Sequence, residues 1–213
     1  MSQKSIKVSE VLPVMEMNTK LADAITAAAI KLFRERGFDR VSVNDICLEA
    51  GIARSSFYRA FSNKKEIIRY VLENTQSRSI VGIGDLVSAE NDFERMWCIG
   101  SRYIDIVLEF GPKLIGTLMQ MELKGELDAL AMVHSVDDWF IRLTRNCQQV
   151  GTIRNAAPPE ILGPMGVNAV YQVTYDWCSH QGQIPIRRRA RQAVEILYDL
   201  APEYRWPELT AEA

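Results

Sequence analysis

Residues 43–61 carry the side chains whose types and spacing point most clearly to a chemistry, the recognition of a polyanion. Two short helical runs, residues 43–50 and 53–60, meet at Gly51. The second run places on its outer face the residues Arg54, Ser55, Ser56 and Arg59, with Tyr58 beside them. Arginine can bond guanine or phosphate, tyrosine can reach phosphate, and short hydroxyls let a helix come close to the bases. This layout predicts a helix-turn-helix, in which the second helix enters the DNA major groove. The alternatives are that the arginines are ordinary solvated side chains and that Tyr58 packs on the first helix.

The charge distribution supports an anion-binding function at one end of the chain only. Residues 54–69 hold five Lys or Arg and one Glu. Residues 1–80 have a net charge of +4 and residues 81–213 a net charge of −6, although the whole chain has a net charge of only −2. A basic first third joined to an acidic remainder indicates two modules with different tasks.

Helical periodicity covers the chain, and no alternation long enough to name a strand occurs, so we expect an all-α fold. Ser42 with Asp45, and Asn63 with Glu66, have the spacing of helix-capping boxes. Gly82 and Gly84 mark a loop, and Gly111 with Pro112 marks a break between helices. The expected helices are residues 19–36, 43–50, 53–60, 64–78, 91–110, 112–123, a stretch within 126–150, 159–179 and 186–200.

Three successive segments extend this pattern beyond a single short motif. They are AITAAAIKLFRERGFDRVSVNDI, AGIARSSFYRAF and NKKEII. In order and spacing, the segments resemble the N-terminal DNA-binding domain of the TetR family of bacterial transcriptional regulators, over about residues 20–70. The resemblance implies a homodimer that binds a double-stranded DNA operator. It also implies a C-terminal domain that binds a small-molecule inducer and forms the dimer interface.

The resemblance also assigns roles to individual residues. It places Ser42 and Asn44 at the start of the first motif helix, where the family contacts phosphates, and it matches Tyr58 to the family's phosphate-contacting tyrosine. Lys64 matches the family's lysine at the start of the fourth helix and is expected to contact phosphate. The recognition helix carries Arg54, Ser55, Ser56 and Arg59. Two positions depart from the family pattern. Ala53 stands where Ser or Thr is common, so the recognition helix is expected to lack a side-chain cap. Ala60 stands where a bulky His or Tyr is common.

We therefore divide the chain into four parts. Residues 1–18 are a flexible N-terminal arm, residues 19–63 the helix-turn-helix domain, residues 64–80 a connecting helix, and residues 81–213 the ligand-binding and dimerisation domain. Apolar faces near the end of the chain are expected to cover the domain's own core and to meet a second copy in a four-helix interface. They comprise Ile161, Leu162, Met165, Val170, Val173 and Trp177 on one helix and Ala190, Ala193, Val194 and Leu197 on the last.

Methionine and aromatic residues are dense in the acidic second domain, which suits an adaptable apolar pocket for a small apolar or aromatic ligand. Each such residue alone is more often core than pocket. The candidate ligand-binding residues are Trp97, Tyr103, Met119, Trp139, Tyr171 and Trp177. Asp105, Glu109 and Asp176 are candidates for a cation-binding edge.

Several other classes of protein are disfavoured. The two histidines and four cysteines lack the spacing of metal ligands, so we expect no metal site, no cofactor and reduced cysteines. Phosphate-binding, zinc-protease and serine-hydrolase motifs are absent, so we expect no enzyme. No signal peptide or apolar segment long enough to span a membrane is present, so we expect a cytoplasmic protein with no membrane partner.

The arginine cluster at residues 187–191 resembles a second nucleic-acid site, but we favour a solvated or partner-facing turn. The function expected is a ligand-responsive DNA-binding regulator, a repressor rather than an activator. One alternative is a regulator controlled by a protein partner or by no ligand. Another is a helical small-molecule-binding protein or enzyme that no longer binds DNA. The operator, the inducer and the regulated genes cannot be read from the sequence.

Overall fold

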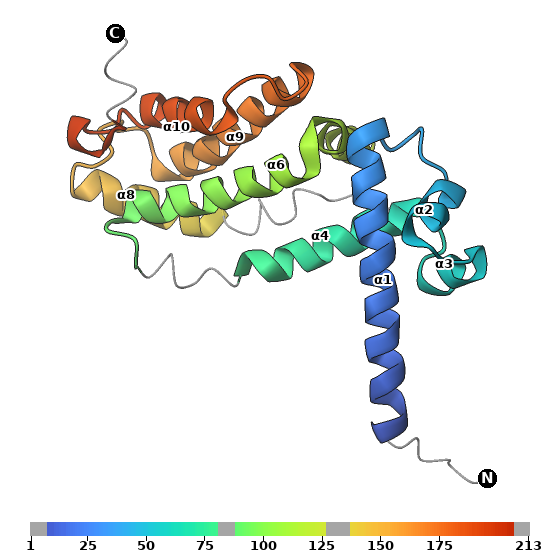
Figure 1. The fold of residues 1–213 in the computed structure, drawn as a ribbon. Coiled ribbons are helices and arrows are strands. Elements are labelled where there is room, and N and C mark those ends of the chain that lie inside the picture. Colours follow the sequence, from blue (N-terminus) through green and yellow to red (C-terminus); the bar gives the residue numbers. More distant parts are fainter. Residues whose placement is uncertain (1–7, 81–87, 127–136, 207–213) are drawn as a thin grey trace. The chain divides into compact units, whose positions relative to one another are not determined.

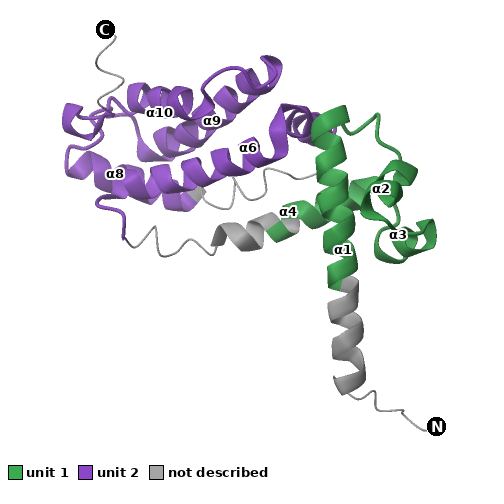
Figure 2. Ribbon diagram, in the orientation of Figure 1, with its two compact units in different colours: residues 1–74 green, residues 75–213 purple. Residues whose placement is uncertain are grey.

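The computed structural model describes residues 8–80, 88–126 and 137–206, and its helices confirm the all-α architecture (Figure 1). Within these ranges the only β-type pairing is a single antiparallel bridge between Ile153 and Leu200. The chain divides into two compact units, residues 1–74 and 75–213 (Figure 2). The helices are α1 (Val8–Arg36), α2 (Val43–Ala50), α3 (Arg54–Ala60), α4 (Lys64–Ile80), α6 (Asp92–Leu123), α8 (Asp137–Gln149), α9 (Pro159–Ser179) and α10 (Ile186–Leu197), followed by a 3₁₀ turn at Pro202–Tyr204.

The first unit is built around the apolar face of α1, which packs against α2 and α3. Burying such faces against one another removes apolar surface from water and stabilises α2 and α3, which are too short to persist alone. The rings of Phe33 and Phe38 meet at 5.0 Å and close the end of the core where α1 stops at Gly37. The fully buried side chains of this core are Ile25, Ala29, Phe33, Ile46, Phe57 and Ile67.

The first helix begins earlier than expected. We placed its start at Asn18 or Thr19, whereas α1 already includes Val8. Asn18 and Thr19 therefore lie inside the helix and do not cap it. Two glutamates, two methionines and one leucine, all of which favour helix, lie between residues 10 and 17 and are compatible with a helix that extends toward the N-terminus.

The second unit has α6 as its longest helix, with α8, α9 and α10 packed around it. The expected break is present as a kink, because Gly111 has φ 78° and ψ 163° and the helix resumes at Pro112. A Cβ added to Gly163 would lie 3.0 Å from the Ile141 backbone nitrogen, so glycine permits the close approach of α9 to α8. The expected boundaries of α9 are confirmed. The Gly82 and Gly84 loop and residues 127–136 lie outside the described residues.

In the described part of the chain, no helix has a stretch long and apolar enough to cross a bilayer. No group of three or more metal-ligating side chains gathers in that same part. All four cysteines are free thiols.

Candidate DNA-binding surface and ligand pocket

The start of α2 is fixed by a reciprocal cap, as the sequence predicts. The Asp45 backbone N–H donates to Ser42 Oγ at 3.2 Å, and the Ser42 backbone N–H donates to Asp45 Oδ2 at 2.8 Å. The bonds from Ser42 hold the pKa of the Asp45 carboxyl below its usual value. At the other end of α2, Gly51 adopts φ 65°, a left-handed conformation that favours glycine and turns the chain toward α3.

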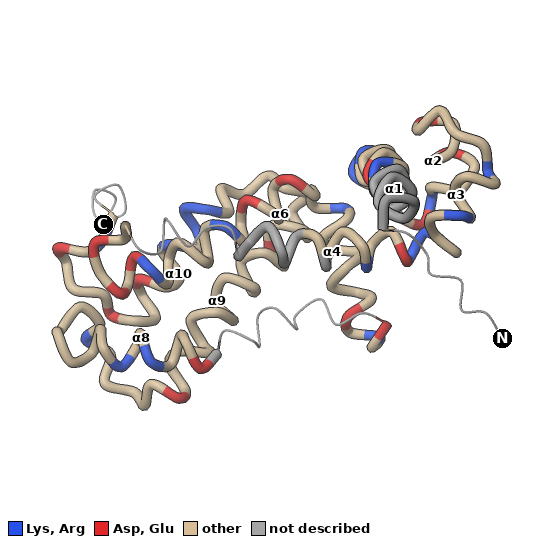
Figure 3. Tube along the Cα trace, turned by 90° about the horizontal axis from the view of Figure 1, so that it is seen from below, with Lys and Arg blue, Asp and Glu red and all other residues tan. Residues whose placement is uncertain are grey.

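The recognition helix α3 exposes the face predicted from the sequence. Phe57 is fully buried and fixes the rotation of the helix. Tyr58 is 51% exposed and meets Phe57 edge-on at 5.4 Å, so it stands at the surface rather than within the core. The absence of a side-chain cap at Ala53 is confirmed. Of the other residues predicted on this helix, Arg54, Ser55 and Arg59 are exposed and Ser56 is half-buried. Basic positions along α3 and the start of α4 are visible in Figure 3.

Lys64, predicted to contact phosphate, also has partners inside the first unit. Its Nζ donates to the carbonyl oxygens of Phe38 at 2.7 Å and Val41 at 3.1 Å, and lies 4.2 Å from the centre of the Phe38 ring. Partial burial lowers the pKa of the ammonium. Lys64 therefore attaches the start of α4 to the loop that leads into Ser42.

The cap of α4 is formed by two residues rather than by one reciprocal pair. Asn63 Oδ1 accepts hydrogen bonds from the backbone N–H groups of Lys65 and Glu66 at 2.9 and 3.1 Å. Glu66, predicted to bond back to Asn63, instead accepts from the Ser62 backbone N–H at 2.7 Å. The side chain thus reaches one residue further back than a capping box requires.

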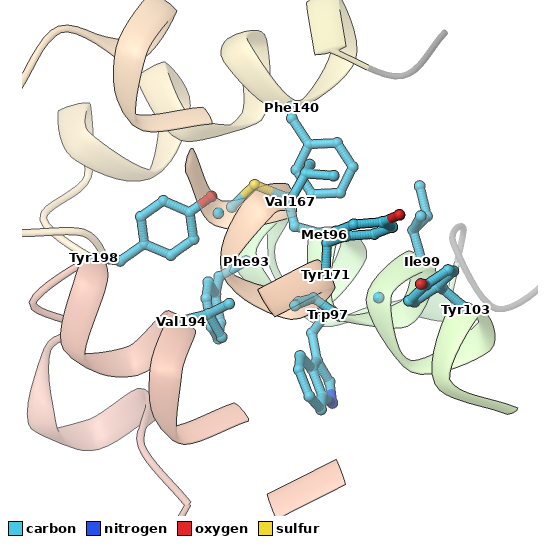
Figure 4. A pocket seen from close by; sticks show the side chains of 13 residues that line it. Phe93, Met96, Trp97, Ile99, Tyr103, Phe140, Val167, Tyr171, Val194 and Tyr198 are labelled. Carbon is cyan, nitrogen blue, oxygen red and sulfur yellow. The ribbon is translucent and has the colours of Figure 1, made fainter. Parts of the chain in front are cut away.

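The second unit contains an apolar pocket of about 720 Å³, including its open mouth (Figure 4). Side chains of α6, α8, α9 and α10 surround it, and none of the lining residues is charged. Three tyrosines are among the lining residues, Tyr103, Tyr171 and Tyr198. The Tyr171 hydroxyl donates to Glu122 Oε2 at 3.0 Å, and burial raises the pKa of Tyr171 and takes the pKa of Tyr103 to about 12. The lining residues are Phe93, Met96, Trp97, Ile99, Gly100, Tyr103, Phe140, Gly166, Val167, Val170, Tyr171, Val194 and Tyr198.

Three of the six predicted ligand-binding residues line this pocket, namely Trp97, Tyr103 and Tyr171. The other three do not. Met119 follows the kink of α6, on a segment whose direction differs from that of the pocket wall. Trp139 precedes Phe140 on α8, and neighbouring helical positions point about 100° apart. Trp177 is buried and covers the turn at Gly182.

One pattern in the sequence could have identified more of the residues that line the pocket. Phe93, Met96, Trp97, Gly100 and Tyr103 follow the three- and four-residue spacing of a single helix face. The three carboxylates proposed as a cation-binding edge are not part of the pocket lining. Asp105 instead forms an ion pair with Arg187 at 2.5 Å. Glu122 is the carboxylate that accepts a hydrogen bond from a pocket residue, Tyr171.

The interpretation of the arginine cluster as a solvated turn is wrong for Arg191, which is fully buried. Its guanidinium bonds Glu94 at 2.9 Å, Glu195 at 2.7 Å and the Tyr204 carbonyl oxygen at 2.9 Å. It also lies over three aromatic rings, those of Phe93, Trp97 and Trp206, at 4.6 to 5.1 Å. Buried charge is tolerated because each part of the guanidinium has a partner.

Comparison with known proteins places these observations in a family. The model of the TetR family of bacterial regulatory proteins matches residues 25–71. The HTH-type transcriptional regulator YvdT of Bacillus subtilis is 28% identical over 122 residues, which are 55% of this chain and 56% of that protein. The regulator EthR of Mycobacterium tuberculosis is 32% identical over 79 residues, 36% of this chain and 37% of that one. The chain thus spans about half the length of the first of these relatives and about a third of the second.

Solved structures show the same fold over most of the chain. A TetR-family regulator of Marinobacter aquaeolei has a TM-score of 0.64 and 20% identity, covering 89% of this chain and 95% of that one. FadR of Bacillus subtilis, solved with stearoyl-CoA, has a TM-score of 0.60 and 16% identity, covering 82% and 96%. Residues 25–71 thus form a helix-turn-helix domain of the TetR family of bacterial regulatory proteins, followed by a helical second unit.

Proposed function

We propose that this chain is a homodimeric repressor of the bacterial cytoplasm, which binds a double-stranded DNA operator and is released from it by a small uncharged ligand. The observation that carries the proposal is the presence of two separate devices. One is a folded helix-turn-helix with an exposed basic recognition helix, and the other is an apolar pocket in the second unit.

The DNA contacts follow from which side chains are exposed. Arg54, Ser55, Ser56 and Arg59 would face the bases, because they share the outer side of α3. Ser42 and Asn44 at the start of α2, together with Tyr58, would bind phosphates. Lys64 has three N–H groups and uses two on carbonyls, which leaves one for a phosphate.

The ligand is inferred from the pocket. FadR of Thermus thermophilus and FadR of Bacillus subtilis were solved with acyl-CoA molecules. Here the lining holds no charged side chain that could pair with a phosphate. Since burying an unpaired charge is costly, we propose an uncharged, largely apolar or aromatic ligand.

The dimer would use the outer sides of α9 and α10. Of the residues predicted for this interface, Leu162, Val170, Trp177, Ala190 and Val194 are buried within the unit itself. Ile161 and Met165 on α9 remain exposed, as does Ile196 on α10. A second copy that covers these side chains would bury the apolar surface that a single unit leaves in water.

The switch would act through α4, which runs from Lys64 to Ile80 and so has residues in both units. A ligand that favours a different setting of α4 would alter the spacing of the two recognition helices, which must match successive major grooves about 34–36 Å apart. Linkage requires that ligand and DNA weaken each other's binding equally, by typically about 1–3 kcal/mol.

The test begins with sequencing of genomic DNA captured by the purified protein, followed by fluorescence anisotropy on the enriched site. Arg54→Ala and Arg59→Ala should each weaken binding by about 1–3 kcal/mol. Arg189→Ala, at an exposed position of α10, is the matched control and should bind normally. Wild-type affinity should fall steeply with salt, because phosphate contacts release counterions.

Other outcomes would favour the alternatives. Specific binding that no small molecule alters would support control by a protein partner or by no ligand. An absence of salt-dependent binding to duplex DNA would support a helical small-molecule-binding protein or enzyme that no longer reads DNA.

A further inference from the structure

The pocket has a polar atom that its own structure leaves without a partner. Tyr198, the residue that follows α10, is 2% exposed, and its hydroxyl makes no hydrogen bond within the described residues. Most buried polar groups are paired, so a buried hydroxyl without a partner calls for an explanation. A phenylalanine would fill the same space without the cost of an unpaired hydroxyl.

The position of this hydroxyl is well determined by its surroundings. The Tyr198 backbone N–H donates to the Val194 carbonyl oxygen at 3.0 Å, and the Tyr198 carbonyl oxygen accepts from the Asn155 N–H at 3.1 Å. Its ring meets that of Phe93 edge-on at 6.2 Å. A Cβ added to Gly166 would lie 1.9 Å from the hydroxyl oxygen, so the glycine makes the room that the hydroxyl occupies.

The polar neighbours of the hydroxyl do not replace a ligand. The Thr144 hydroxyl is the neighbour whose hydrogen-bonding influence opposes the rise in the pKa of Tyr198, which burial takes to about 12, but the two hydroxyls do not meet the distance and angles of a hydrogen bond. Thr144 Oγ1 donates to Met96 Sδ at 3.8 Å, and a thioether sulfur is a weak acceptor. Because no protein acceptor meets hydrogen-bond geometry with the Tyr198 hydroxyl, its proton stays available to an acceptor on a ligand.

The two ends of the pocket differ in what they offer. Figure 4 shows Tyr198 on one side and Tyr103 on the other, with Tyr171 between them. The Tyr171 hydroxyl gives its proton to Glu122, so toward the ligand it can only accept. The Tyr198 hydroxyl can donate a hydrogen bond to a ligand, and apolar side chains line most of the pocket between Tyr198 and Tyr171.

We propose that the Tyr198 hydroxyl donates a hydrogen bond to an acceptor oxygen of the bound ligand, an uncharged and otherwise apolar molecule such as a ketone, ester or ether. This inference rests on the pocket being the ligand site proposed above. It adds the chemical class of the ligand and the residue that selects it.

The test compares two series of probes with the same carbon skeletons, alkylbenzenes and the corresponding phenyl-substituted 2-alkanones. One pair is butylbenzene and 4-phenyl-2-butanone. Dissociation constants are measured by ligand-observed NMR with the full chain in the absence of DNA. Tyr198→Phe removes the hydroxyl, and Tyr175→Phe, at a residue that is 57% exposed on α9, is the matched control.

In Tyr198→Phe the dissociation constant of the ketones should rise about 3- to 10-fold, which is the range expected for one neutral hydrogen bond, while that of the alkylbenzenes changes less than 2-fold. Tyr175→Phe should change neither series. An equal loss for both series, or no change for the ketones, would overturn the proposal. So would a wild-type protein that binds neither series.

A second measurement needs no variant. Infrared spectra of a ketone labelled with ¹³C at its carbonyl should show a lowered stretching frequency when it is bound to the wild type. A bound frequency equal to that in a hydrocarbon solvent would show that no donor reaches the oxygen. Both experiments measure ligand binding without the operator, so they test the role of Tyr198 separately from the repressor mechanism. If a bound ketone left the affinity for DNA unchanged in a separate measurement, that result would contradict release of the operator by such a ligand and not the role of Tyr198.

Discussion

Lys64 provides the prediction that the structure specifies most closely. Its ammonium donates to two carbonyl oxygens, those of Phe38 and Val41, residues that are only 3% and 1% exposed. A hydrogen bond from a charged group contributes about 1.5–3 kcal/mol. Water reaches the half-buried ammonium and weakens both bonds, so we expect Lys64→Met to lower the unfolding free energy of the first unit by about 2–4 kcal/mol.

Urea unfolding followed by far-UV circular dichroism measures this loss. The four tryptophans, Trp97, Trp139, Trp177 and Trp206, all belong to the second unit, so their fluorescence follows that unit separately. Lys20→Met removes the same charge at an exposed position of α1 and should cost less than about 0.5 kcal/mol. The third N–H is the one we assign to phosphate, so the salt dependence of operator binding should also flatten, by about 0.9 for each subunit. Equal unfolding midpoints for the two variants would refute the anchoring by Lys64.

Four further expectations follow from particular contacts. Arg191→Met should lower the unfolding free energy of the second unit by about 3–5 kcal/mol in urea unfolding, because it leaves two carboxylates without their buried cation. The pair of changes Met165→Asp and Ile196→Asp should convert a dimer to a monomer in light scattering, and a wild-type monomer would contradict the proposed interface. Gly111→Ala should cost about 1–3 kcal/mol in thermal unfolding, because φ 78° with ψ 163° suits only glycine. Burial raises the pKa of Cys147 from 9.0 to about 12, so stability should be constant below pH 9 and fall as the pH rises toward 12, with a smaller fall in Cys147→Ala.

The helix-turn-helix was predictable because its signals are local. Ser42 and Asp45 form their cap across three residues, and Gly51 ends α2 by its own backbone conformation. The period of the apolar residues sets which face of α3 is buried, so the exposure of Arg54 and Arg59 follows without knowledge of distant contacts. The start of α1 failed the same reasoning, since Asn18 and Thr19 can cap a helix but do not oblige it to begin there.

The apolar pocket was predictable only in part because its walls come from four helices. Composition identified the correct domain and residue types, and Trp97, Tyr103 and Tyr171 do line the space. Choosing Phe140 over Trp139 requires the rotation of α8 about its axis, which packing against α9 decides. The hydroxyl of Tyr198 enters the lining only because Gly166, far away in sequence, leaves room for it.

Arg191 shows why residues 187–191 could not all be correctly predicted as a solvated or partner-facing turn. In sequence, residues 187–191 look like one basic patch, but helical spacing places Arg187, Arg191 and Glu195 together on one face of α10. That much was available from the sequence. The remaining partners, Glu94 on α6 and the backbone of Tyr204, come from elements whose positions only the tertiary structure supplies.

The same arrangement connects the pocket to the end of the chain. Phe93 and Trp97 line the pocket and also lie beside the Arg191 guanidinium. Trp206 meets Trp97 edge-on at 5.6 Å, and its backbone N–H donates to Glu195 at 3.0 Å. A buried guanidinium with this many partners resists rearrangement, because moving one carboxylate away would leave part of its charge buried and unpaired, which is costly. We therefore expect this wall of the pocket to resist movement, and Met96, Ile99 and the side chains of α9 to adjust more readily.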